Sequence, residues 1–246
     1  MADAFVPYAP LNVPKPFADA VWIVDGPEIA MDYLGLKLPF PTRMTVVRLP
    51  DGGLWLHSPI AFDQGLAASI AAFGPVRHLI APNTLHYWWI PDWAARFPEA
   101  QLHAAPGLDK AAKRPLPPHR VLGDAPDPAW TEVIDQLLVP GGLLTEVDFL
   151  HRPSRTLILT DLIENFEPRR IRPRWLRALV RWSGAADPDG KAPIDMQLSF
   201  WRHKRTLRSA VRRMIDWAPE QIVLAHGRCY DRDGTVELKR AFRWAL

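Results

Sequence analysis

The stretch HLIAPNTLHYWW, residues 78–89, joins an apolar run to polar side chains and then to a group of aromatic rings. The apolar run is typical of a buried strand that ends before Pro82. Asn83 and His86 follow directly, and Asn83 suits the cap of a following helix. Three adjacent aromatic residues come next: Tyr87, Trp88 and Trp89. We expect these rings either to pack in the core or to form an apolar wall of a ligand pocket.

Three other apolar runs also lead into side chains that can bind metals. LWLH (54–57) ends at His57, RTLILT (155–160) leads to Asp161, and IVLA (222–225) leads to His226. Ligands of α/β sheets bind beyond the carboxyl ends of the strands, where residues distant in sequence converge. Imidazole and carboxylate together are a common metal-binding set. The pattern therefore predicts a polar site at one edge of the sheets.

The composition is that of one α/β domain with a sizeable core. The chain has 246 residues, of which 48% are hydrophobic, and its net charge is only +3. That charge gives no general attraction to nucleic acid or membranes, and Cys229 alone cannot form an internal disulfide. We see no signal peptide and no apolar stretch near the ~20 residues that span a bilayer. We expect a cytoplasmic protein without a membrane span.

At these residues the chain resembles the metallo-β-lactamase family. The segments that correspond to the family's site loops are WLHSP (55–59), APNTLHYWW (81–89), VPGGL (139–143), LILTDL (157–162) and VLAHG (223–227). The run PFPTRMTVVRLPDGGLWLHSPI (39–60) resembles an uncharacterised branch of that superfamily. The resemblance implies an αββα sandwich over residues 1–246, with two mixed sheets packed face to face and helices outside. The turn at Asp51-Gly52 and the site residues are expected at one edge of the sandwich.

The departures from the family pattern reduce its metal site. Asn83 stands in the histidine-rich loop, and Gly142 replaces the middle histidine, so two metal ions are not expected. The resemblance implies that His86, Asp161 and His226 are the candidate ligands of one divalent metal: zinc, iron or manganese. His57 takes the place of a family aspartate and is expected to orient a ligand or to have a structural role, with a fourth ligand as the further alternative.

Two functions are compatible with this pattern. The first is a metal-assisted hydrolase that acts on an ester, amide, lactone or phosphodiester. The second is a metal-free, non-catalytic protein that binds a small molecule, and the lost donors at Asn83 and Gly142 favour this alternative. We expect a small-molecule substrate or ligand and no nucleic acid, and homo-oligomerisation stays open.

Two basic features have their own alternatives. EPRRIRPRWLRALVRW (167–182) opens a basic helical insertion near 167–215, and we expect helices outside the sandwich with tryptophans inward and arginines in solvent. A basic amphipathic helix can also lie on an anionic membrane. Arg43 is expected either to bind an anionic ligand or to hold a buried carboxylate such as Asp25.

Overall fold

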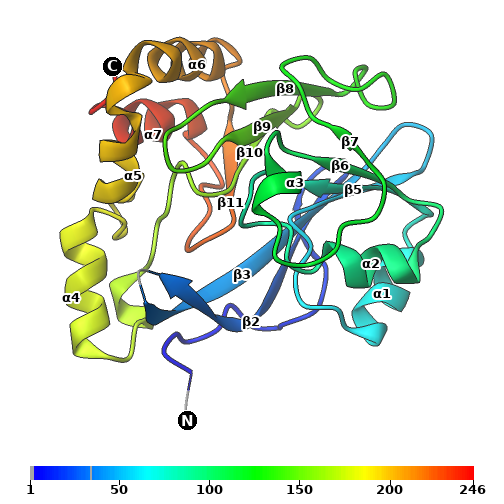
Figure 1. Ribbon diagram of the computed structural model, residues 1–246, viewed down its shortest axis with the longest axis horizontal. Helices are drawn as coiled ribbons and strands as arrows, with labels where there is room; N and C mark the ends of the chain where they lie inside the picture. The colour runs from blue at the N-terminus through cyan, green and yellow to red at the C-terminus, as the bar shows by residue number, and fades with distance from the viewer. Residues whose placement is uncertain (1–2, 34) are drawn as a thin grey trace.

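The computed structural model describes residues 3–33 and 35–246, and its amino-terminal half forms a seven-stranded sheet (Figure 1). The strands follow one another in space as they do in sequence. The first four pair antiparallel, and the pairings from β4 to β7 are parallel. The strands are β1 (Lys15–Ala18), β2 (Val21–Tyr33), β3 (Leu36–Arg48), β4 (Leu54–His57), β5 (Val76–Ala81), β6 (Gln101–Ala104) and β7 (His119–Val121).

A second, four-stranded sheet is built from the carboxyl-terminal half in the order β11-β10-β9-β8. It is also mixed, because β10 pairs antiparallel with β9 and parallel with β11. Its strands are β8 (Ile134–Val139), β9 (Glu146–His151), β10 (Thr156–Leu159) and β11 (Gln221–Leu224).

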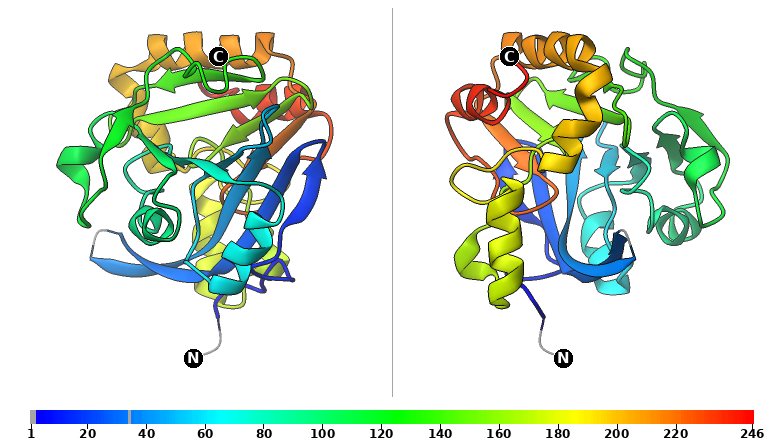
Figure 2. Two further views of the ribbon diagram at one scale, coloured as in Figure 1. Left: turned by 90° about the vertical axis from the view of Figure 1, so that its right-hand side faces the viewer. Right: turned by 60° about the vertical axis from the view of Figure 1, so that its left-hand side comes forward.

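Helices cover the outer faces of both sheets (Figures 1 and 2). The helices beside the first sheet are α1 (Gln64–Ala71), α2 (Ile90–Arg96) and α3 (Leu108–Ala111). Those of the second half are the 3₁₀ helices η1 (Pro168–Arg170) and η2 (Phe200–Arg202), with α4 (Arg174–Ser183), α5 (Ile194–Ser199), α6 (Lys204–Asp216) and α7 (Gly234–Ala241). No helix among the described residues combines the length and the apolar character needed to cross a bilayer.

Three packed layers of apolar side chains hold this arrangement together. In β4, Leu54 and Leu56 face α1 and α2, whereas Trp55 between them packs against Phe149 of the second sheet. Alternation along a strand explains this split, since successive side chains point to opposite faces. A third cluster lies between the second sheet and α6 and α7. The αββα order of layers follows, as the sequence predicts.

The turn at Asp51-Gly52 forms as predicted but lies at the other edge. β3 and β4 pair antiparallel, and Gly52 has a φ of +81°, which glycine adopts without steric cost. The turn precedes Leu54, at the start of β4, whereas His57 ends that strand. The expectation that the turn shares an edge with the site residues is therefore wrong, because the two ends of one strand point to opposite edges.

The prediction for the tryptophans of the basic segment is also wrong. The segment forms η1 and α4, as expected, but Trp175 and Trp182 are 58% and 72% exposed. The inward face of α4 is formed by Leu176 and Val180, which pack against Phe166. Residues four apart share a helix face, so these two aliphatic side chains leave both tryptophans outside it.

Candidate metal centre

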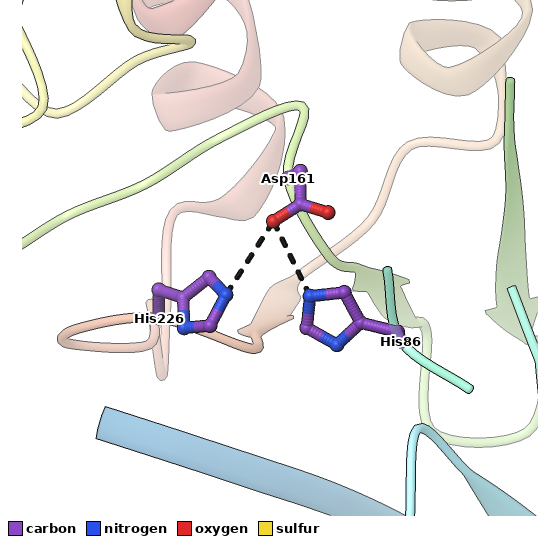
Figure 3. A group of neighbouring side chains, drawn as sticks. All are labelled: His86, Asp161 and His226. Carbon is purple, nitrogen blue, oxygen red and sulfur yellow. Dashed lines mark hydrogen bonds and ion pairs between the residues drawn. The ribbon is translucent and has the colours of Figure 1, made fainter. Parts of the chain in front are cut away.

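His86, Asp161 and His226 meet at the edge of the two sheets where their strands end. Asp161 follows β10, His226 follows the parallel neighbour β11, and His86 lies in the turn between β5 and α2. Figure 3 shows both imidazoles directed at the same carboxylate oxygen. The Asp161 Oδ1 atom is 3.3 Å from His86 Nε2 and 3.4 Å from His226 Nε2. The sequence-predicted set is thus brought together, with candidate ligand atoms within 4.8 Å of one another.

These separations match the coordination sphere of a small divalent metal. Ligands at 2.0–2.2 Å from a tetrahedral zinc ion are separated from one another by about 3.3–3.6 Å. The two Asp161–imidazole separations, 3.3 and 3.4 Å, fall in this range. Two neutral imidazoles and one carboxylate form a donor set that zinc, iron and manganese accept. The residues therefore fit one metal ion.

Both imidazoles are oriented by a contact through their other ring nitrogen. His226 Nδ1 donates to the Pro41 carbonyl at 2.8 Å, which directs Nε2 toward Asp161. His86 Nδ1 lies 2.6 Å from the Ser58 hydroxyl. Such contacts fix the tautomer and the ring direction of metal-binding histidines. Ser58 was not anticipated from the sequence, and its φ of +52° is a strained value at a site next to His57.

Asn83 organises the carboxylate side of the site. Its Oδ1 accepts the backbone N–H groups of Leu85 and His86, each at 2.8 Å, so it caps the turn before α2 and not the helix itself. Its Nδ2 donates to Asp161 Oδ2 at 2.7 Å. The amide also contacts Thr160 Oγ1 at 3.0 Å and Glu146 Oε2 at 3.3 Å. The completely buried amide thus holds one oxygen of Asp161 and leaves the other toward the imidazoles.

Asp161 and His86 shift each other's pKa because they lie close together. Burial alone would lower the pKa of His86, but the neighbouring Asp161 carboxylate raises it above the ordinary value. Burial alone would raise the pKa of Asp161, but the charge of His86 and bonds from both imidazoles hold it well below its usual range. Both imidazoles lie within ion-pair distance of the Asp161 carboxylate.

Three further buried carboxyl groups lie close to the site and were missed by sequence analysis. Glu146 accepts the N–H groups of Thr160 and Asp161 at 2.8 and 2.9 Å. Burial, and then Glu146, raise the pKa of Asp148 well above its ordinary value. Burial raises the pKa of Glu164 to about 8. Glu146 and Asp148 alternate with apolar residues along β9, which is typical of a half-exposed strand, yet helices cover this face.

His57 lies beside the cluster but outside it. Its ring stacks on Trp55 at 5.4 Å and meets Phe149 edge-on at 5.6 Å, between the two sheets. Its buried Nε2 has no hydrogen-bond partner among the described residues. Burial, reinforced by His86, lowers the pKa of His57 to about 3. Among the described residues, His57 is not part of the group whose candidate ligand atoms lie within 4.8 Å of one another.

The aromatic residues after His86 are divided between the core and the surface. Tyr87 is 3% exposed in the core cluster of the first sheet, and Trp89 packs against that cluster. Trp88 is 42% exposed and lies under the Arg114 guanidinium. The three rings do not form a common wall, and two of them take the core-packing alternative.

Gly142 is packed too closely for any side chain. A Cβ atom placed there would lie 2.3 Å from the Ser199 carbonyl oxygen, well inside contact distance. A histidine at this position would therefore displace the backbone where α5 ends. This packing is compatible with glycine at the position where the family resemblance implies a histidine.

Arg43 takes the second of its two predicted roles. Its Nε donates to Asp25 Oδ1 at 2.9 Å, and both side chains are buried. Its NH1 donates to the carbonyls of Leu224 and Gly227, at 2.6 and 2.7 Å. The pair therefore anchors the loop that carries His226.

The solved structures most similar in fold include metallo-β-lactamases. The enzyme from Hirschia baltica has a TM-score of 0.61 at 15% identity, covering 95% of this chain and 97% of that one. The mono-zinc form of FIM-1 from Pseudomonas aeruginosa has a TM-score of 0.57 at 14% identity, covering 95% and 96%. Rubredoxin oxygen:oxidoreductase from Desulfovibrio gigas has a TM-score of 0.64 at 12% identity, covering 95% and 61%. The chain therefore has the metallo-β-lactamase fold.

The sequence comparison is more specific about the family than about the activity. The family model described as a domain of unknown function (DUF4336) matches residues 18–172, and the chain belongs to this family. A search of the curated proteins found no significant match. This agrees with the resemblance to an uncharacterised branch of the superfamily.

Proposed function

We propose that the protein is a hydrolase with a single divalent metal, held by His86, Asp161 and His226. The observation that carries the proposal is the pair of 3.3 and 3.4 Å separations between Asp161 Oδ1 and the two Nε2 atoms. The Nδ1 contact of each ring adds support, because it directs Nε2 into the site. The mono-zinc form of one structural neighbour shows that the fold accommodates one metal, although at 14% identity it supports the fold alone.

Each residue of the site has a definable task in such a hydrolase. A divalent metal supplies a Lewis acid that polarises the scissile carbonyl or phosphoryl group and activates water. His226 Nδ1 donates its proton to the Pro41 carbonyl, and Asn83 Nδ2 donates to Asp161 Oδ2, so the imidazole and the carboxylate keep their directions. Glu164, with a pKa of about 8, holds its proton at neutral pH and limits the negative charge around the site. The substrate class is an ester, amide, lactone or phosphodiester.

The alternative is a metal-free, non-catalytic protein that binds a small molecule. The observation that favours it is that Asp161 already has ion-pair partners in both imidazoles and a donor in Asn83. Its carboxylate therefore needs no metal for electrostatic balance. Gly142 and Asn83 also remove donors that the family pattern supplies.

Metal content separates the two functions. We expect the protein, purified without added metal, to contain one zinc, iron or manganese per chain, as measured by plasma mass spectrometry. His226→Ala should abolish the uptake, since three ligands leave no spare donor. His119→Ala is the matched control, because His119 pairs with Asp109 outside the site. A wild-type protein that stays metal-free after incubation with each metal would refute the hydrolase and favour the binding protein.

A further inference from the structure

One face of α4 exposes a line of large apolar side chains. Trp175, Leu179 and Trp182 are 58%, 37% and 72% exposed. They are spaced by four and three residues, so they lie on the same side of the helix. Soluble proteins seldom expose a contiguous apolar patch without a partner for it.

The next two helices also expose large apolar side chains. Ile194 and Leu198 of α5 are 40% and 68% exposed, and Trp201 of η2 is 67% exposed. α4 and α5 run along the same flank of the molecule in Figure 1 and in the right view of Figure 2. We call this surface the tryptophan face; its members are Trp175, Leu179, Trp182, Ile194, Leu198 and Trp201.

Cations surround the tryptophan face and have few counter-charges. The segments 168–186 and 196–215 contain no Asp or Glu. The exposed cations on these segments that have no ion pair among the described residues are Arg172, Arg174, Arg181, Arg202, Lys204, Arg205, Arg208 and Arg212. An apolar patch bordered by unpaired cations is complementary to a partner that has anionic groups at its surface and an apolar layer beneath them.

Three occupants are conceivable, and the chemistry separates them. A second copy with the same face would bring like charges together, which is unfavourable. Nucleic acid would use the arginines and stack on the tryptophans, but it offers nothing to aliphatic side chains such as Leu179 and Leu198. An anionic lipid surface accommodates all three groups: tryptophan at the headgroup level, aliphatic side chains below it, and cations at the phosphates.

We propose that the tryptophan face docks the protein onto anionic phospholipid membranes. Docking of this kind lies in the membrane plane and needs no spanning helix. Phe166 belongs to the cluster that holds α4, and its ring stacks with that of His226 at 6.3 Å. The proposal itself does not depend on a metal or on catalysis.

Sedimentation of the full chain with vesicles tests the proposal. We expect binding to vesicles of equal parts phosphatidylcholine and phosphatidylglycerol, little binding to phosphatidylcholine alone, and release by high salt. The double variant Trp175→Ser/Trp182→Ser should lose binding. Arg174→Gln/Arg181→Gln should weaken it roughly 20- to 30-fold, since each cation near an anionic surface contributes about fivefold.

Matched controls sit on the opposite flank. Trp88→Ser removes a tryptophan that is 42% exposed just before α2, and Arg77→Gln removes an exposed cation of β5. Both should bind vesicles like the wild type, and thermal unfolding should show that every variant is folded. Failure of the wild type to bind anionic vesicles would overturn the proposal. Binding to DNA without binding to vesicles would also overturn it. So would light scattering that shows a wild-type dimer, lost in the Trp175→Ser/Trp182→Ser variant, when the wild type does not bind vesicles.

Discussion

Replacing His57 by phenylalanine tests how the buried imidazole responds to acid. The ring lies between Trp55 and Phe149, is 2% exposed, and leaves its Nε2 without a partner among the described residues. Phenylalanine fills a similar volume and keeps the ring contacts. It also removes an unpaired polar atom, so we expect it to raise the free energy of unfolding at pH 7 by about 1–2 kcal/mol.

The substitution has its larger effect on how the free energy of unfolding depends on pH. Burial lowers the pKa of His57 in the folded protein to about 3 from the ordinary histidine value of 6.5, so the unfolded chain binds this proton first as pH falls. Stability from the neutral ring is therefore present above pH 6.5 and is lost on acidification by about 1.4 kcal/mol per pH unit. At pH 5 the loss assigned to His57 is about 2 kcal/mol. Burial also lowers the pKa of His103, to about 4, so the wild type has other acid-sensitive groups.

Urea unfolding at pH 7, 6 and 5 measures the effect as a difference between the two proteins. We expect His57→Phe to lose about 2 kcal/mol less than the wild type between pH 7 and pH 5. His203→Gln is the control variant, because it removes a partly exposed histidine just before α6, away from His57. If the free energy of unfolding fell equally with pH in the wild type and His57→Phe, the acid sensitivity assigned to His57 would be refuted. Loss of metal uptake in His57→Phe would show that this histidine is a ligand.

Two further changes test the supports of the site. Ser58→Ala removes the hydroxyl that lies 2.6 Å from His86 Nδ1. We expect the metal affinity to fall by about 10- to 100-fold in a competition titration, with the fold retained. Unchanged affinity would show that the contact does not orient the ring. Arg43→Met leaves the buried Asp25 with Lys15 alone, so the free energy of unfolding should fall by about 3 kcal/mol in urea titrations. A loss below 1 kcal/mol would show that Lys15 compensates for the missing guanidinium.

The convergence of Asp161 and His226 could be predicted from the sequence because it depends on strand direction. Each follows an apolar run, and β10 and β11 are parallel neighbours, so their carboxyl ends lie side by side. The αββα order of layers was predicted by the resemblance to the metallo-β-lactamase family, whereas the strand and helix pattern alone indicated mixed sheets flanked by helices. The position of the Asp51-Gly52 turn was wrong because a hairpin turn and the end of its second strand lie at opposite edges.

The features that were missed depend on which face another element covers. Trp175 and Trp182 are exposed because Leu176 and Val180 already fill the inward face of α4, and apolar content alone does not identify the buried side. Ser58 reaches His86 through a strained loop conformation that no sequence pattern encodes. Long-range packing decides each of these cases.

The two departures from the family pattern are compensated by the packing around them. At Gly142 the Ser199 carbonyl fills the space that a side chain would need. At Asn83 the amide is fully bonded: its oxygen accepts two backbone N–H groups, and its nitrogen donates to Asp161 Oδ2. A neutral amide is a poor ligand, but it restrains the carboxylate without competing for the metal. Because Asp161 Oδ2 accepts from Asn83 while Oδ1 lies toward both imidazoles, the amide keeps the carboxylate orientation on which the proposed metal site depends.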